Sequence, residues 1–429
     1  MNYNEAIDFI HGTYKFGIKL GLENISKLLE YMGNPQKSLK IIHVAGTNGK
    51  GSTCVYISSI LEAASYKVGL YTSPYLEEFE ERMKINGKNI SKEKIIHYVE
   101  YVKPLISKML ADGYNHPTEF EVITAIAFKY FYDEKVDFLV LEVGLGGRFD
   151  ATNVIQQSLV SVITTIDYDH TDRLGKTLGE IAFEKAGIIK YKGAVVSFYQ
   201  DNSALNVIMD ACKVKDAYLK VLDKANVVVK QQKPEFNLFD YKEYKNLKIK
   251  MIGLHQIYNA ALAVETVITL KNLYGYKIDE SAIKNGLLNG RWPGRMEVLK
   301  RNPYIILDGA HNVQGLTALK NSLDLFNYNR LILVIGMLKD KDTKHMIEII
   351  IPYADVVITT TPASDRAYKG TELAEKINHP NVIPINKIED AAKYALNESK
   401  NDDLILFCGS LYMIGYVRSF LKGIIDFTN

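Results

Sequence analysis

The sequence predicts an α/β fold with two mostly parallel sheets, and three observations support this prediction. Apolar runs of strand length alternate with helical patterns from residue 41 onward, which is the order of repeated strand–helix–strand units. Several of these runs are almost entirely apolar, as in strands that are buried on both faces. A second series of such runs begins near residue 304, and 429 residues exceed the ~150 residues of a typical domain.

The first series of predicted elements follows a helical lead-in of about 25 residues. Its expected strands cover residues 41–45, 67–72, 137–143 and 159–166. Helical patterns cover residues 50–64, 92–110 and 121–132. This order predicts parallel strands joined by right-handed crossovers.

The second series has expected strands at residues 304–308, 330–336, 354–360 and 403–409. Two prolines and a glycine lie between the two series, so we place the domain boundary within residues 293–303. Residues 221–251 alternate between apolar and polar positions around a polar segment. They predict an antiparallel hairpin at the edge of the first domain.

Composition excludes several classes of protein. The 52 basic and 50 acidic residues give a net charge of +2, which argues against a protein that coats nucleic acid. The apolar fraction of 47% excludes general disorder. The chain has three widely spaced cysteines, no apolar run of ~18 residues and no signal-like start. We therefore expect a cytoplasmic protein that binds neither nucleic acid nor membranes.

A glycine-rich segment, GTNGKGS at residues 46–52, follows the first predicted strand and opens a predicted helix. Its glycines allow a tight turn with inward N–H groups, beside the positive end of the helix dipole. Lys50 can reach the outer phosphates of a nucleotide, and Ser52 can place its hydroxyl on Mg²⁺. Val44 stands where the usual phosphate loop has its first glycine, so the loop is a variant. The alternative is a glycine-rich turn with a surface lysine.

Three polar residues follow other predicted elements of the first domain. Glu142 stands at the carboxyl end of a strand, where open α/β sheets place their ligands; it is either a partner of nucleotide-bound Mg²⁺ or an acid that caps a loop. His170 lies just past the next strand and is either a metal ligand or a solvated histidine. Lys185 falls in the last turn of a short helix that ends at Gly187. A cation is stabilised there by the negative end of the helix dipole, and this alone could explain the lysine.

Two residues in the second half of the chain also have both a functional and a structural interpretation. Arg295 lies in the linker, where it could clamp a phosphate or remain a surface residue. Asp308 ends a predicted apolar strand and therefore stands at a sheet edge. It could also cap the helix expected after His311.

The chain resembles a known family through motifs that occur in one order. They are GTNGKGS, SPYLEEFEERM, TEFE, LEVGLGGRFDATN, DHTDRLG, EKAGIIK, GLHQIYNAALA, GRMEVL and LDGAHN. Together they resemble the folylpolyglutamate synthase and dihydrofolate synthase family of the Mur ligase superfamily. The resemblance covers nearly the whole chain. It implies a P-loop-type, mostly parallel ATP-binding domain at residues 1–294, followed by a smaller Rossmann-like α/β domain at 295–429.

The resemblance also implies roles for individual residues. The implied catalytic residues are Lys50, Glu142, His170 and Lys185, the last of them carbamylated. The implied ligands of two Mg²⁺ ions are Ser73, Glu142 and His170, and the loop adds Ser52. The implied nucleotide contacts are Gly46, Thr47, Asn48, Gly49, Lys50, Gly51, Ser52, Asn259, Arg295 and Asp308. His311 and Asn312 are expected near the amino acid. Arg82 is expected to contact substrate, because residues 16–24 and 73–82 are expected to carry the pterin-binding determinants.

The implied activity is the ATP-dependent addition of L-glutamate to a folate, or to dihydropteroate, by a monomer. Two alternatives remain open at this point. A Mur-type ligase acting on a peptidoglycan precursor would carry a further domain before the loop, whereas only 45 residues precede Gly46. An ATP-dependent switch without ligase chemistry would need the loop, but not Glu142, His170 and Lys185 together.

Overall fold

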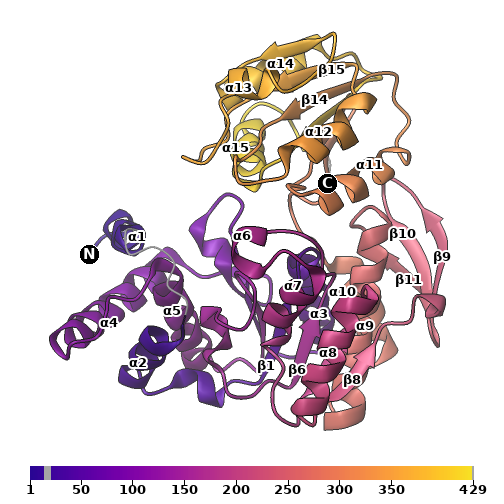
Figure 1. Cartoon of the computed structure of the whole chain (residues 1–429). Helices are drawn as coiled ribbons and strands as arrows, with labels where there is room; N and C mark the ends of the chain where they lie inside the picture. The colour runs from indigo at the N-terminus through magenta and orange to yellow at the C-terminus, as the bar shows by residue number, and fades with distance from the viewer. Residues whose placement is uncertain (14–20, 428–429) are drawn as a thin grey trace. The chain divides into compact units, whose positions relative to one another are not determined.

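The structure is a computed structural model that describes residues 1–13 and 21–427. The chain divides into two compact units, each discontinuous in sequence (Figure 1). The first unit comprises Met1–Val227 and Asn259–Gly290, and the second comprises Val228–Tyr258 and Arg291–Asn429. Among the described residues, no helix combines the length and the apolar character needed to span a lipid bilayer.

The first unit is built on a sheet whose described strands number eight, in the order β4-β3-β2-β5-β1-β6-β7-β8. These strands are β1 (Ile41–Ala45), β2 (Val68–Tyr71), β3 (Met83–Ile85), β4 (Lys88–Asn89), β5 (Phe138–Glu142), β6 (Val160–Ile163), β7 (Ala194–Ser197) and β8 (Tyr218–Val221). Only β3 and β4 are antiparallel to their neighbours. Because β5, β1 and β6 are adjacent and parallel, their carboxyl ends meet at one edge of the sheet.

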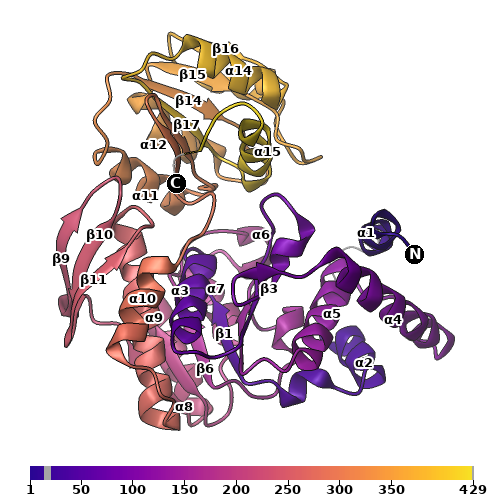
Figure 2. The same ribbon diagram turned by 180° about the vertical axis from the view of Figure 1, so that it is seen from behind.

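Helices cover both faces of this sheet. They are α1 (Tyr3–Gly12), α2 (Glu23–Tyr31), α3 (Lys50–Ala63), α4 (Lys92–Ala111), α5 (Glu119–Asp133), α6 (Thr171–Leu174), α7 (Leu178–Ala186), α8 (Asn202–Val214), α9 (Leu254–Tyr274) and α10 (Glu280–Asn289). The views from front and back place α3, α9 and α10 on one face and α7 and α8 on the other (Figures 1 and 2). Gly286 lets α10 approach α3 closely, since a Cβ there would lie 2.4 Å from the Cα of Ile60.

The second unit has a sheet of six described strands in the order β12-β13-β17-β14-β15-β16. These are β12 (Glu297–Arg301), β13 (Tyr304–Leu307), β14 (Leu331–Ile335), β15 (Val356–Thr359), β16 (Val382–Pro384) and β17 (Leu404–Cys408). All pairs are parallel except β12 with β13. Its helices are α11 (Val313–Leu323), α12 (Thr343–Ile350), α13 (Gly370–Ala374), α14 (Ile388–Glu398) and α15 (Leu411–Lys422).

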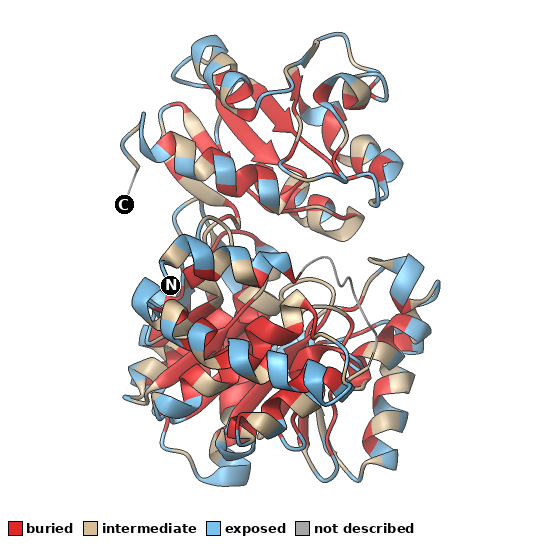
Figure 3. Cartoon of the chain, turned by 90° about the vertical axis from the view of Figure 1, so that its left-hand side faces the viewer, coloured by how far each residue is buried: buried red, intermediate tan, exposed pale blue. Residues whose placement is uncertain are grey.

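The predicted class, an α/β protein with two mostly parallel sheets, is confirmed. In the central strands β1, β5, β14 and β17 every residue is buried, and Figure 3 shows buried strands in the interior of each unit. Such strands have helices on both faces and neighbours on both sides, so only apolar side chains fit at most positions.

The segment predicted as a hairpin at the edge of the first domain groups instead with the second unit. It forms β9 (Val227–Gln232), β10 (Asn237–Tyr241) and β11 (Tyr244–Ile249), of which β10 and β11 are antiparallel as predicted. Two contacts explain the grouping. Ile252 packs into the core of the second unit, and Glu235 pairs with Arg301 on β12 at 2.6 Å.

The expected linker at residues 293–303 is in part a strand. Residues 297–301 form β12, and Glu297 accepts two hydrogen bonds from the Nε and Nη2 atoms of Arg418 on α15 (2.9 and 2.8 Å). The compact units separate between Gly290 and Arg291, a few residues before the predicted 294/295 division.

Candidate active site

The glycine-rich loop joins the end of β1 to the start of α3. Gly46 and Gly49 have φ angles of 155° and 84°, which side chains rarely adopt. A Cβ at Gly46 would lie 1.7 Å from Oγ1 of Thr164, and one at Gly49 would lie 2.5 Å from Oδ1 of Asn259. These positions therefore require glycine, and Asn259 lies against the loop.

A second segment, which follows β6, holds this loop in place. The N–H of Thr47 donates to the carbonyl of Thr165 at 2.7 Å, and the hydroxyl of Thr164 donates to the carbonyl of Asn48 at 2.7 Å. The hydroxyl of Thr47 also donates to the carbonyl of Asp167 at 3.0 Å. These hydrogen bonds fix Thr47 and Asn48 to the segment after β6, so the loop is preformed, as an anion-binding site requires.

Two lysines converge on the loop. Nζ of Lys50 donates to the carbonyls of Gly46 and Thr47, both at 3.1 Å, and Nζ of Lys185 donates to the carbonyl of Gly46 at 3.0 Å. Lys185 is 3% exposed, and burial together with the charge of Lys50 lowers its pKa to about 7, against a smaller opposing effect of Asp169. Lys185 is therefore not the surface cation that its place in the helix suggests. Near pH 7 a large fraction of it is a neutral amine.

Glu142 is the last residue of β5, as predicted. The register pairs it with Val44 on β1, two residues before Gly46. Its side chain is buried, and its Oε2 accepts the N–H of Ser73 at 3.1 Å. Ser52, in the first turn of α3, is also buried. A carboxylate and two serine hydroxyls are the oxygen donors that Mg²⁺ prefers, so these residues fit that ion.

His170 lies beyond β6, as predicted, and begins α6 with φ of 50°. Its side chain is 36% exposed, and its Nε2 is 3.9 Å from Oδ1 of Asp169. In the described part of the chain, no group of three or more His, Cys, Asp or Glu side chains could hold a metal ion. A metal at Glu142 or His170 would therefore also need serine, phosphate or water oxygens.

In the second unit, Asp308 organises the turn after β13. It is 5% exposed and accepts the N–H groups of Met296 and Ala310, each at 2.8 Å. Burial raises the pKa of Asp308, and the charge of Arg295 opposes that shift. Arg295 lies over Gly309, since a Cβ there would be 2.1 Å from its Nη1.

The expected alternative role of Asp308 as a helix cap is wrong. Asn312 is the residue that caps α11, because its Oδ1 accepts the N–H of Gly315 at 2.8 Å. The preceding His311 makes a 2.8 Å hydrogen bond from Nδ1 to the carbonyl of Gly309. His311 and Asn312 therefore lie at the same turn as Asp308 and Arg295, within the second unit.

Two residues near this turn were missed by the sequence analysis. Burial and the charge of Arg295 lower the pKa of His255 to about 4. Ser410 begins α15 and is 1% exposed, and within the described chain its Oγ has no hydrogen-bond partner. The N–H of Gly409 donates to the carbonyl of Ala310 at 3.0 Å, which places Ser410 beside the turn. A serine directly after a predicted strand that ends in glycine was the available signal.

Arg82 lies at the end of a short 3-10 helix, η3 (Phe79–Arg82). Its guanidinium stacks on the rings of Tyr75 and Phe79, with centroid distances of 5.1 and 5.8 Å. Its carbonyl accepts the N–H of Thr72, just after β2. The other segment expected to bind a pterin, residues 16–24, lies partly outside the described residues.

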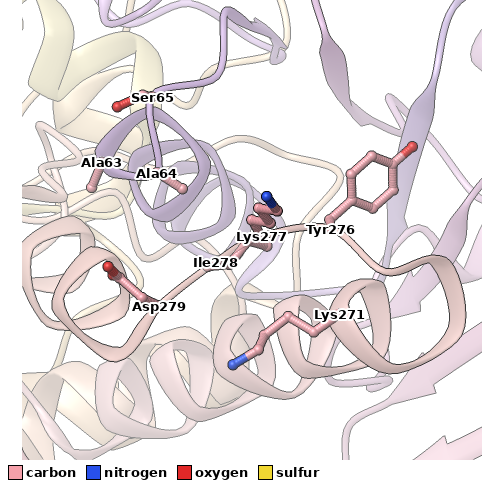
Figure 4. Close-up of a pocket in the computed structure, with 8 residues that line it drawn as sticks. All are labelled: Ala63, Ala64, Ser65, Lys271, Tyr276, Lys277, Ile278 and Asp279. Atoms are coloured by element: carbon pink, nitrogen blue, oxygen red, sulfur yellow. The ribbon is translucent and has the colours of Figure 1, made fainter.

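The pocket in Figure 4 lies elsewhere in the first unit. Its lining residues are Ala63, Ala64, Ser65, Lys271, Tyr276, Lys277, Ile278 and Asp279. It lies at the C-terminal end of α3, whose 14 residues span about 21 Å from the phosphate loop. The side chains of Lys271 and Lys277 point in different directions (Figure 4), so they form no common binding point. This pocket is not part of the candidate active site.

Comparison with known proteins gives consistent matches. Residues 44–267 match the Mur ligase middle domain, and residues 294–411 match the Mur ligase glutamate ligase domain. A dihydrofolate synthase/folylpolyglutamate synthase of Bacillus subtilis is 38% identical over 98% of this chain and 99% of its own length. The crystal structure of a folylpolyglutamate synthase from Thermotoga maritima superposes with a TM-score of 0.86 at 38% identity, covering 99% of this chain and 98% of the other.

A third comparison concerns a nucleotide complex. The folylpolyglutamate synthase of Mycobacterium tuberculosis, solved with ADP and AMPPCP, superposes with a TM-score of 0.88 at 30% identity. The match covers 99% of this chain and 100% of the other.

Proposed function

The chain belongs to the folylpolyglutamate synthase and dihydrofolate synthase family of Mur ligases, and we propose that it is an ATP-dependent ligase that joins L-glutamate to a folate carboxylate. The observation that supports this most is the convergence at one sheet edge of the glycine loop, Lys50, Lys185 and Glu142. A switch protein would need the loop alone.

The reaction requires activation because a carboxylate does not react with an amine at pH 7. The folate carboxylate oxygen attacks the γ-phosphorus of ATP, and ADP leaves to give an acyl phosphate. The glutamate amine then attacks the acyl carbon, loses a proton, and inorganic phosphate leaves. Because three anionic groups must approach one another, catalysis consists largely of placement and charge neutralisation.

The first unit supplies the nucleotide site of this proposal. The N–H groups of residues 48–52, at the start of α3, would hold the phosphates, with Lys50 released from the loop carbonyls to contact them. Asn259 would contact the nucleotide from beside Gly49. The family resemblance adds Arg295 and Asp308 of the second unit. The related enzyme solved with ADP and AMPPCP supports nucleotide binding.

Magnesium is the second proposed cofactor. Glu142, Ser73, Ser52 and His170 would hold two ions, which when bound neutralise charge on the transferring phosphoryl group. Lys185 would support this site after reacting with CO₂, because a carbamate is an anion and forms only from a neutral amine. Its pKa of about 7 makes that form available near neutral pH.

The amino-acid substrate is proposed to bind near the turn that carries His311 and Asn312. The buried hydroxyl of Ser410 at the start of α15 is a donor suited to a carboxylate. In the first unit, Arg82 would contact the folate.

The function is tested by ADP release from purified protein supplied with ATP, L-glutamate and a folate. We expect release only when all three are present, with a glutamylated product detected by mass spectrometry. Dihydropteroate and reduced folates are compared to separate the first glutamate addition from later ones. ADP release from ATP alone would favour a switch, and dependence on a peptidoglycan nucleotide precursor would favour a Mur-type ligase.

We further propose that the enzyme is a cytoplasmic monomer. The three cysteines, Cys54, Cys212 and Cys408, are buried and form no disulfide, which suits a reducing compartment. Light scattering during gel filtration measures the oligomeric state.

A further inference from the structure

A buried chain of hydrogen bonds in the first unit has no part in the assignments above. Nε2 of His43, on β1, lies 2.8 Å from Oγ1 of Thr152, and that oxygen lies 2.5 Å from Oδ1 of Asp150. His43 and Thr152 have no exposed surface, and Asp150 is 7% exposed. The chain therefore runs through the protein interior.

The hydrogen-bond partners of Asp150 determine which atom donates and which accepts in this chain of hydrogen bonds. Its Oδ2 accepts the N–H of Leu145 at 2.8 Å and its Oδ1 accepts the N–H of Thr152 at 3.0 Å, so both oxygens act as acceptors. The hydroxyl of Thr152 must then donate to Asp150, and Nε2–H of His43 must donate to Thr152. Burial lowers the pKa of His43, so its ring is neutral and its Nδ1 is an unprotonated acceptor. It is buried, and no described residue bonds to it.

The two ends of the chain lie at functional segments. His43 is three residues before Gly46 and pairs in register with Leu141, the residue before Glu142. At the other end, the carboxylate of Asp150 fixes Leu145, three residues after Glu142. The chain thus ties the strand that leads to the phosphate loop to the segment that follows Glu142.

Packing alone does not explain these residues. A histidine with an unbonded nitrogen destabilises the interior of a strand whose other residues are all buried, whereas an apolar side chain would not. Polar groups that weaken a core are expected where they serve a site. Next to this chain, Nζ of Lys190 donates to Oδ1 of Asn153 at 2.7 Å and to the carbonyl of Ile155 at 2.6 Å, so the residues after Thr152 are also fixed.

We propose that His43 and Thr152 are positioning residues for the ligase reaction. Through Asp150 they hold residues 144–150 in place, and with them the Glu142 side of the active site. This inference rests on the proposed function. It does not extend to nucleotide affinity, because the phosphate loop has separate anchors at Thr164 and Thr165.

The test compares Thr152→Val, Thr152→Ser and His43→Leu with the wild type. Valine has the shape of threonine without the hydroxyl, and serine restores the hydroxyl. We expect kcat at least tenfold lower for Thr152→Val, about 1.4 kcal/mol in the barrier, and within threefold of wild type for Thr152→Ser. The Kd for ADP, measured by calorimetry, should stay within twofold for all three variants.

His43→Leu separates positioning from packing. It removes the unbonded nitrogen, so the melting temperature should equal or exceed that of the wild type while kcat falls at least fivefold. Wild-type kcat in this variant would overturn the proposal, even if Thr152→Val failed to fold. Equal loss of activity in Thr152→Ser and Thr152→Val would also overturn it. A wild-type protein that releases no ADP would instead reject the proposed function, and this inference with it.

Discussion

Lys50 and Lys185 donate hydrogen bonds to the same acceptor, the carbonyl oxygen of Gly46, at 3.1 and 3.0 Å. Two ammonium groups this close repel each other, and Lys185 is the one that lies in the interior. The structure therefore favours loss of the proton from Lys185.

Lys185 should make stability depend on pH in a defined direction. Its folded pKa of about 7 is below the ordinary value of 10.5, so between these values the unfolded chain binds more protons and stability rises with pH. Lys185→Met should therefore raise the melting temperature most below pH 7, and the gain should shrink toward pH 10. Thermal melts in CO₂-free buffer measure this. A gain that is constant with pH would contradict the lowered pKa.

Lys185 should also be the residue that binds CO₂. With ¹³C-labelled bicarbonate, the wild type should show a carbamate signal by NMR that Lys185→Met lacks. Lys190→Met is the matched control, because Lys190 is also buried with a pKa lowered to about 8 but donates to Asn153 and Ile155 rather than to the phosphate loop. If Lys190→Met lost the signal and Lys185→Met kept it, the carbamate would lie on Lys190 instead.

Gly46→Ala should abolish nucleotide binding. A Cβ at this position would lie 1.7 Å from Oγ1 of Thr164, so the loop must shift away from its anchor. We expect the Kd for ADP to rise at least 100-fold by calorimetry. Gly113→Ala is the control, because Gly113 also has positive φ, 85°, but open space around it. Equal effects of both changes would point to general instability.

Glu142→Ala and Glu142→Gln should leave a folded but inactive protein. Removing one group that stabilises the transferring phosphoryl costs roughly 3–4 kcal/mol, or 10²–10³ in kcat. ADP release with glutamate and folate measures the loss, and circular dichroism verifies folding. Glu134→Gln is the control, since Glu134 is an acid of the first unit that pairs with Lys67 and Lys94. Activity near that of the wild type would remove Glu142 from the mechanism.

Arg295→Ala should raise the KM for ATP at least tenfold if Arg295 contacts the nucleotide as proposed. A charge-assisted hydrogen bond to phosphate is worth roughly 1.5–3 kcal/mol. Arg301→Ala, which breaks only the ion pair with Glu235, should change KM less than twofold. Steady-state kinetics at varied ATP concentration measures KM for both variants. An unchanged KM in Arg295→Ala would show that Arg295 does not contact the nucleotide.

The sequence was most informative where residues are buried on both faces. The apolar run that forms β5 could only be an interior strand, and the acidic residue at its end, Glu142, therefore stood out as a candidate site residue. β12 was hidden because nearby prolines and Gly294 suggested a linker, while its strand conformation depends on pairing with β13. The alternation in residues 228–258 predicted strands, but alternation does not say which core a strand faces.

Local sequence patterns could not predict which single polar residues are buried. The burial of Lys185 results from close packing against a glycine. A Cβ at Gly147 would lie 2.7 Å from the carbonyl oxygen of Glu184, the residue before Lys185. The hydrogen bonds of His43 and the isolated hydroxyl of Ser410 likewise depend on residues distant in sequence. The positions of Gly46, Glu142 and Asp308 could be predicted because each directly follows or ends a strand, and that of Lys50 because it begins the helix after the glycine-rich loop.

The interleaving of the two units limits how this chain can be cut. A fragment ending at residue 294 would carry β9–β11 without the sheet of the second unit, and its complement would lack the segment that contributes Ile252 to its core. Neither half of a gene split there encodes a self-sufficient folding unit. A division that respects the two units would have to join residues 228–258 to residues 291–429, and residues 259–290 to residues 1–227.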